Sequence, residues 1–144
     1  MEKFSPLYLK MCEKGKRIFG RLVQKNYWFY HPILNDEEVK ERQVEKILGS
    51  DVLTSDSIEH YPLHECIWLP TVKEIKKMAE DIEVYEAELE KFLNDDKGYW
   101  GYPIGMKPRN IFKTLKEQWL AYYMAEKSQI WSEKNEDWVN IKSL

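Results

Sequence analysis

The stretch Ile67-Trp68-Leu69-Pro70-Thr71 marks the point where an extended segment of the chain gives way to a helix. Thr71 is followed three residues later by Glu74, and this capping-box spacing satisfies free backbone N–H groups at a helix start. Beyond it, apolar side chains recur every three or four residues, as they do on one face of a helix. The spacing predicts a helix over residues 72–93 that ends at residues 94–98. Its apolar face consists of Ile75, Met78, Ile82, Tyr85, Leu89 and Phe92.

The apolar face of this helix has two alternative partners. One is a second copy of the chain, in a coiled coil, and the other is a sheet within the same chain. The flanking positions are mostly acidic, so two copies side by side would repel each other. We therefore expect the face to pack within the chain, near Trp68 and Trp119, and the acidic side to be solvated. The acidic residues are Glu80, Asp81, Glu83, Glu86, Glu88 and Glu90.

The other segments alternate between helical and extended patterns. Helical spacing with cap residues predicts helices over residues 6–23 and 36–48, and an amphipathic helix that begins between Asn110 and Thr114. Aromatic or alternating patterns predict strands over residues 27–30 and 65–69 and a hairpin over residues 130–141. Residues 49–59 are expected to form a surface loop with a short extended piece at Val52-Leu53. This order predicts an α+β fold, with helices packed on a small, mostly antiparallel sheet built from these strands.

Composition is that of a folded protein. The chain has 144 residues, 43% hydrophobic and 33% charged, which is the usual size of one domain and argues against wholesale disorder. We expect a single globular domain over residues 1–144. Aromatic residues make up 14%, with nine tyrosines and six tryptophans. Because these side chains are enriched in cores and at interfaces, the surplus permits a binding surface.

Charge and targeting signals limit the classes of partner. The formal net charge of −3 argues against broad, sequence-independent nucleic-acid binding, which depends on many basic residues. The sequence contains no apolar run long enough for a signal peptide or a membrane span. We therefore expect a cytoplasmic protein that does not bind membranes, with Cys12 and Cys66 as reduced thiols.

The glycine-rich segment over residues 98–106 is the candidate binding element. Glycines supply unusual backbone angles, and the aromatic residues supply contact area. The alternative is that Trp100 and Ile104 only fix a structured loop to the core. The candidate partner-binding residues, which include two nearby basic ones, are Tyr99, Trp100, Tyr102, Lys107 and Arg109.

Motifs that indicate catalysis or a cofactor are absent from the sequence. It has no glycine-rich phosphate loop, serine elbow or histidine–glutamate helix motif. His60, His64 and Cys66 have a metal-like spacing, but structural zinc sites use four closely spaced ligands. We therefore predict a protein that is not an enzyme, with no catalytic residues, no metal and no cofactor.

Three short blocks of the chain are residues 11–14, residues 67–70, and residues 117–127 with Trp131 and Trp138. These blocks resemble small uncharacterised proteins of phages and prophages in Gram-positive bacteria. The blocks cover about half of the chain and occur in the same order in those proteins. Where the relatives have a glutamine-rich helix start, this chain has Thr71-Val72-Lys73-Glu74, and residues 35–59 have no counterpart. The resemblance implies phage or prophage origin and no particular activity.

These features favour a non-enzymatic phage or prophage accessory protein that binds a host or phage protein. The alternative is an accessory protein that binds single-stranded nucleic acid through the aromatic and basic residues between positions 99 and 116. The sequence predicts neither the identity of the partner nor the oligomeric state.

Overall fold

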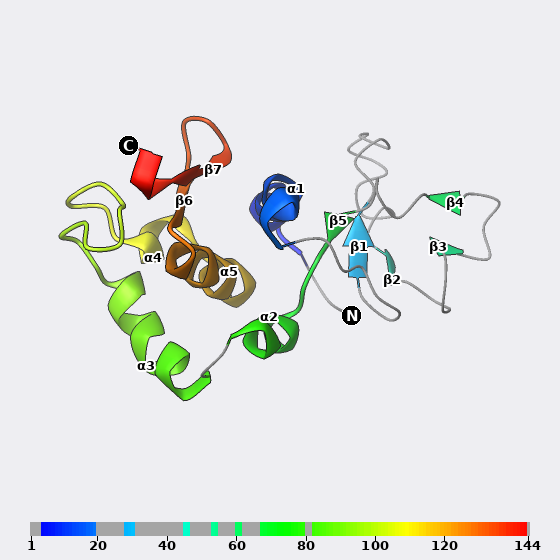
Figure 1. Ribbon diagram of the computed structural model, residues 1–144, viewed down its shortest axis with the longest axis horizontal. Helices are drawn as coiled ribbons and strands as arrows, with labels where there is room; N and C mark the ends of the chain where they lie inside the picture. Colours follow the sequence, from blue (N-terminus) through cyan, green and yellow to red (C-terminus); the bar gives the residue numbers. More distant parts are fainter. Residues whose placement is uncertain are drawn as a thin grey trace. The chain divides into compact units, whose positions relative to one another are not determined.

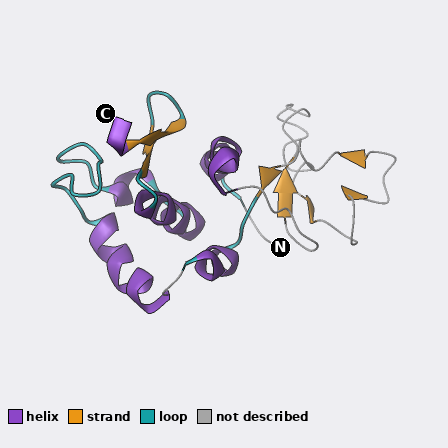
Figure 2. Cartoon of the chain, in the orientation of Figure 1, coloured by secondary structure: helices purple, strands orange, loops and turns teal. Residues whose placement is uncertain are grey.

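The computed structural model describes residues 4–19, 28–30, 45–46, 53–54, 60–61, 67–79 and 82–143. The chain divides into two compact units, one of residues 1–11 and 71–144 and one of residues 12–70. Figures 1 and 2 show the helices and strands that the described residues form. Helices and antiparallel strand pairs occur in separate stretches of the chain, so the predicted α+β class is confirmed. That the whole chain is one globular domain stays a prediction.

The first unit is mainly helical. Helix α1 (Pro6–Phe19) begins in it and continues into the second unit. The first unit also contains α2 (Val72–Met78), α3 (Ile82–Leu93), α4 (Pro108–Ile111) and α5 (Leu115–Glu126). Strands β6 (Gln129–Ser132) and β7 (Asp137–Asn140) and a 3₁₀ turn, η3 (Ile141–Ser143), follow α5. The short helix α4, which has proline at its first position, has no counterpart among the predicted elements.

Capping boxes begin both α2 and α5. The Thr71 hydroxyl accepts from the Glu74 N–H at 3.2 Å, and the Glu74 carboxylate accepts from the Thr71 N–H at 2.9 Å. Thr114 and Glu117 repeat this arrangement at the start of α5. The starts of α2 and α5 are therefore fixed by the local signals that predicted them.

Helix α5 forms the centre of the first unit. Glu117 and residues 119–125 are all buried, and α2, α3 and β6 lie against the helix. The prediction that this helix is amphipathic is wrong, because neighbours cover it on nearly every side. In Figure 1 the hairpin and the helices α2, α3 and α4 surround α5.

The single helix predicted over residues 72–93 is wrong, because it is two helices. Ala79 has an extended backbone, with φ −77° and ψ 137°, and ends α2. Asp81, whose residue type favours helix caps over helix interiors, directly precedes the start of α3 at Ile82. The break gives each helix its own direction of approach to α5.

The apolar face of these two helices packs within the chain, as predicted. Ile75, Leu89 and Phe92 are buried, whereas the side chain of Ile82 lies outside the described residues. The element that covers the face is α5, which carries the buried Trp119, so the prediction that a sheet covers it is wrong. The predicted proximity of Trp68, which belongs to the second unit, stays a prediction. On the acidic side, Glu86 and Glu90 are exposed, as expected.

The C-terminal hairpin is confirmed, with Ile130 opposite Val139 and Trp131 opposite Trp138. It forms a two-stranded sheet of its own, so the prediction that it joins the other strands in one sheet is wrong. The Trp138 indole N–H donates to the Met11 carbonyl at 2.9 Å and ties the hairpin to α1. Because a two-stranded hairpin is only marginally stable alone, its packing against α5 takes the place of a third strand.

The second unit contains short antiparallel strand pairs. Strands β2 (Glu45–Lys46), β1 (Trp28–Tyr30) and β5 (Ile67–Trp68) form one sheet in that order. Strands β3 (Leu53–Thr54) and β4 (His60–Tyr61) form another. The predicted strand over residues 27–30 is confirmed at residues 28–30, and the extended piece at Val52-Leu53 is confirmed at Leu53. The strand predicted over residues 65–69 is confirmed at residues 67–68 and ends before Leu69.

The helix predicted over residues 36–48 is wrong at Glu45 and Lys46. These residues pair with Phe29 and Trp28, so their backbone groups bond across to β1 rather than along a helix. The rest of that prediction lies outside the described residues. Cys12 is buried, whereas Cys66 and His64 lie outside the described residues.

Candidate protein-binding loop

Residues 94–107 join α3 to α4 and are named here the aromatic loop. Its two ends lie close together, because the Gly105 N–H donates to the Asp96 carbonyl at 2.7 Å. In Figure 2 it is the teal loop that projects beside α3. Compact surface loops whose ends meet in this way are frequently functional.

A buried carboxylate fixes the first half of the aromatic loop. Asp95 is only 8% exposed, and its two oxygens accept from the Lys97 N–H and the Trp100 N–H, each at 3.1 Å. A further backbone bond joins the Gly101 N–H to the Gly98 carbonyl at 3.1 Å. These bonds hold the backbone around Tyr99 in one conformation.

Two aromatic side chains attach the loop to the core. The Trp100 ring lies 5.6 Å from the Phe92 ring and 5.4 Å from the Tyr122 ring, in edge-to-face contacts. Tyr102 is buried, and its phenol oxygen accepts from the Trp131 N–H at 3.1 Å. Burial raises the pKa of the Tyr102 phenol, so this group stays neutral well above its usual range. Trp100 and Tyr102 therefore position the loop.

Three apolar side chains of the same loop point into solvent. Tyr99 is 80% exposed, Ile104 is 85% exposed and Met106 is 38% exposed. The Ile104 side chain comes within 3.4 Å of the Cβ position of Gly98, so it lies beside the backbone that carries Tyr99. A single exposed aliphatic residue is common on protein surfaces, whereas several apolar side chains exposed on one loop are typical of an interaction site. We name these three residues the apolar tip.

The exposure of Ile104 bears on the two interpretations of this loop. Trp100 does fix the loop to the core, but Ile104 is largely exposed. The interpretation that Trp100 and Ile104 together only fix the loop is therefore wrong for Ile104. Ile104 and Met106 belong to the exposed surface although neither is among the predicted site residues.

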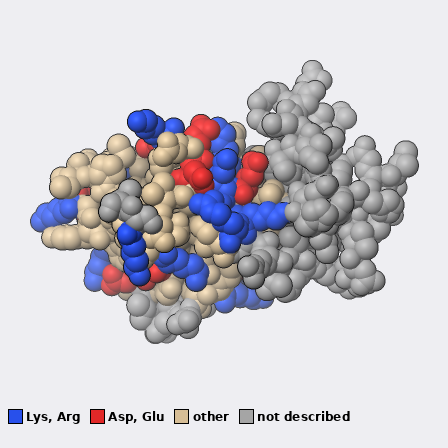
Figure 3. All heavy atoms as spheres, turned by 45° about the horizontal axis from the view of Figure 1, so that its top comes forward, with Lys and Arg blue, Asp and Glu red and all other residues tan. Residues whose placement is uncertain are grey.

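Basic residues follow the apolar tip along the chain. Residues 97–116 contain five basic residues and no acidic one. The Arg109 guanidinium is paired with the Glu90 carboxylate and donates to the Asn94 amide oxygen at 3.2 Å, so it ties α4 to the end of α3. Lys107 precedes α4 and is half-buried. At the left of Figure 3, where the loop lies, the surface is mostly tan with Lys and Arg atoms at its edge.

The five sequence-predicted site residues thus take different roles. Tyr99 is on the surface, together with the half-buried Lys107, whereas Trp100 and Tyr102 support the loop from below. Arg109 is held by Glu90 in an ion pair. Composition locates the loop in the sequence, but which aromatic residues face outward depends on contacts with Phe92 and Trp131.

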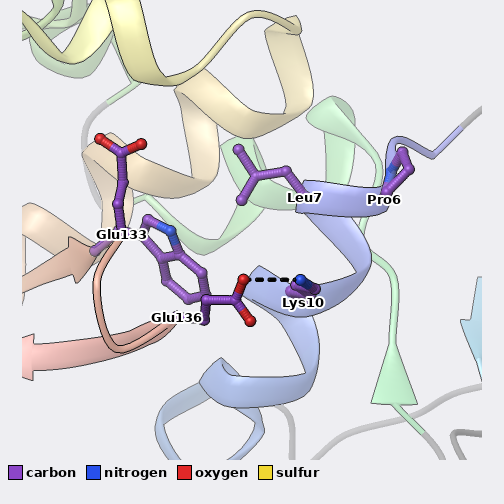
Figure 4. Close-up of a pocket in the computed structure, with 6 residues that line it drawn as sticks. Pro6, Leu7, Lys10, Glu133 and Glu136 are labelled. Carbon is purple, nitrogen blue, oxygen red and sulfur yellow. Dashed lines mark hydrogen bonds and ion pairs between the residues drawn. The ribbon is translucent and has the colours of Figure 1, made fainter.

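A second concave feature lies between the first turns of α1 and the turn of the hairpin. It is lined by six residues, Pro6, Leu7, Lys10, Trp131, Glu133 and Glu136. Figure 4 shows the Lys10 ammonium facing the Glu136 carboxylate, at 3.0 Å. This pair is exposed, and Lys10 already has its counter-charge. Two of the three charged side chains in the lining therefore neutralise each other, and Glu133 is the third.

Neither a metal centre nor a membrane span is found in the described part of the chain. Within residues 4–19, 67–79 and 82–143 and the short strands, no three His, Cys, Asp or Glu side chains are grouped to hold a metal ion. The side chains of His60, His64 and Cys66 lie outside the described residues. Among the helices described, none is long and apolar enough to cross a bilayer.

Comparisons with known proteins identify no relative of this chain. The chain matches no protein-family model, no curated protein and no solved structure.

Proposed function

We propose that this protein is a non-enzymatic accessory protein of phage or prophage origin that acts in the cytoplasm by binding a host or phage protein. The observation that supports this function is the apolar tip. Tyr99, Ile104 and Met106 are held in solvent by a loop whose backbone is fixed. Burying such side chains on a partner is favourable by about 25 cal/mol per Å² of apolar surface.

The order of the loop adds to the affinity that these side chains can give. A flexible loop loses conformational freedom when it binds, and this loss weakens the complex. Asp95, Trp100 and Tyr102 already restrict the aromatic loop in the free protein. The tip therefore has the features of a preformed protein-binding surface, with an aromatic anchor and aliphatic neighbours.

Loop-dependent capture tests this function. The tagged protein is used for affinity purification from lysogenic Gram-positive cells, beside a variant with Tyr99→Ser, Ile104→Ser and Met106→Ser. Leu115→Ser is the matched control, because Leu115 is 57% exposed and lies outside the loop. We expect the native protein and the control to recover the same protein partner and the triple variant to lose it. Recovery of no partner, beside turnover in a hydrolase or nuclease screen, would reverse the proposal.

Binding of single-stranded nucleic acid is the alternative function. The run of five basic residues over positions 97–116 favours it. Stacking on several bases needs several exposed rings, however, and Tyr102 is buried while Trp100 packs on Phe92 and Tyr122. Retention on oligothymidylate that weakens steeply with salt would support this alternative.

A further inference from the structure

Three lysines in or near the aromatic loop form no ion pair with any residue that the structure describes. They are Lys97 in the loop, Lys107 at its end and Lys113 after α4, and we name them the basic rim. No ion pair forms at these three ammonium groups among the described residues, whereas Lys10, Lys76, Lys91 and Arg109 each pair with a glutamate. Lys97 and Lys113 are exposed. The rim therefore carries three positive charges without an ion-pair partner in the described part of the chain, beside one exposed carboxylate, that of Asp96.

The rim and the tip belong to the same surface segment. The bond from the Gly105 N–H to the Asp96 carbonyl brings Lys97, which follows Asp96, next to the Met106-Lys107 end of the loop. Phe112, which precedes Lys113, is buried against Tyr102 at 6.1 Å between ring centroids. All three lysines thus occur within a few residues of groups that anchor the loop.

We infer that the partner segment which covers the apolar tip is an acidic stretch of protein that carries apolar side chains. This inference rests on the proposed function and specifies the chemistry of the partner. Carboxylates of such a segment would meet Lys97, Lys107 and Lys113, while its apolar side chains would cover Tyr99, Ile104 and Met106. Complementary charge of this kind raises association rates and excludes basic partners.

An anionic lipid surface carries negative charge, as an acidic peptide does, but the fixed geometry of the aromatic loop favours a protein partner. A fluid bilayer does not require fixed side-chain positions, whereas a shaped protein surface does. The aromatic loop is fixed by the buried Asp95 carboxylate and by two aromatic anchors. Three lysines are also fewer than the four to eight basic residues that anionic membranes usually select.

Selection from a library of random peptides, about a dozen residues long, tests the inference without knowledge of the natural partner. The immobilised native protein is compared with a variant carrying Lys97→Glu, Lys107→Glu and Lys113→Glu. The matched control carries Lys73→Glu, Lys77→Glu and Lys134→Glu, which changes the net charge equally at exposed positions outside the loop. Vesicles of phosphatidylcholine with phosphatidylglycerol, and oligothymidylate, are tested in parallel.

We expect the native protein and the control to enrich peptides that combine Asp or Glu with apolar residues. The rim variant should bind those peptides about tenfold more weakly or worse, and high salt should weaken native binding because exposed charges are screened. Substitution of the apolar tip should abolish the enrichment. Circular dichroism of each variant checks that the fold is retained.

The opposite results separate the two proposals. Enriched peptides that are apolar without acidic residues, and that bind independently of salt, would overturn the acidic partner and leave the protein-binding function. If no peptide were enriched through the apolar tip, both the acidic partner and the protein-binding function would be contradicted. If the protein bound the anionic vesicles and Ile104→Ser abolished that binding, the partner would be a lipid surface rather than a protein. If it bound oligothymidylate, the partner would be a nucleic acid.

Discussion

At the scale of single residues, Gly101 has no room for a side chain. A Cβ atom there would lie 2.7 Å from Ile141 Cγ2 and 3.2 Å from Ile130 Cγ2, and the φ angle is +101°. Gly105 has a comparable φ of +88° but open space around it. Substitutions at the two glycines therefore distinguish the effect of backbone strain, which both positions have, from the effect of a steric clash, which only Gly101 has.

Replacing Gly101 with alanine should lower stability more than the same change at Gly105. Strain at positive φ costs about 1 to 3 kcal/mol, and a clash in a packed region adds about 1 to 3 kcal/mol. We expect both costs for Gly101→Ala and only the first for Gly105→Ala. Urea unfolding followed by tryptophan fluorescence measures the difference. Equal losses would show that Ile130 and Ile141 yield to the added methyl group.

The phenol of Tyr102 predicts a response to alkaline pH. Burial raises its folded-state pKa, so above about pH 10 the unfolded chain loses a proton that the folded protein keeps. Stability is therefore fully present below pH 10 and falls as the pH rises beyond it. Tyr102→Phe should reduce this slope by up to about 1.4 kcal/mol per pH unit.

Tyr99→Phe is the control for the alkaline titration, because Tyr99 is 80% exposed. It removes the same hydroxyl group as Tyr102→Phe, but at a position outside the core. Denaturant midpoints measured between about pH 8 and pH 11 give the slope for each protein. A Tyr102→Phe variant with the native slope would show that another group controls alkaline unfolding.

At the scale of elements, the two capping boxes share a motif but differ in burial. Glu117 is 3% exposed, and its carboxylate accepts from the Lys113 N–H at 2.8 Å and from the Ser5 hydroxyl at the start of α1. Glu74 is only half-buried and accepts from the Thr71 N–H. Glu117 therefore joins two helix starts, whereas Glu74 caps one.

Glu117→Ala should cost more than Glu74→Ala. Loss of the Glu117 carboxylate leaves partly buried donors without partners, which we expect to cost about 2 to 4 kcal/mol. Loss of the Glu74 cap should cost about 1 kcal/mol. The free energies of unfolding in urea give both values. Similar costs would mean that water replaces the buried carboxylate.

Elements with local signals could be predicted from the sequence, and elements without them could not. Thr71 and Thr114 carry their caps within four residues, so both helix starts are correct. The strand at Glu45-Lys46 depends on β1, which lies more than a dozen residues earlier in the chain. The burial of α5 on nearly all sides likewise depends on α2, α3 and β6. The spacing of residues within α5 does not predict these neighbours.

At the scale of the whole molecule, the structure of the binding loop could likewise be predicted only in part from the sequence. Its glycines and aromatic residues mark it in the sequence, and their positive φ angles confirm that it is structured. Which rings face outward is decided by Trp131, whose N–H donates to Tyr102 from 29 positions further along the chain. The sequence alone therefore placed Tyr102 on the binding surface and left Ile104 off it.

The internal packing of the α2 and α3 face predicts how stability and assembly respond to a cavity. Leu89 is 8% exposed on α3, beside Phe92 and against α5. Leu89→Ala should cost about 2 to 5 kcal/mol and lower the thermal midpoint, because it leaves a core cavity. Leu115→Ala removes the same atoms from a side chain that is 57% exposed, so it should cost far less. Because the face is buried within the chain, neither change should alter the sedimentation coefficient. If Leu89→Ala converted a dimer to a monomer and left the thermal midpoint unchanged, the face would lie between two copies of the chain.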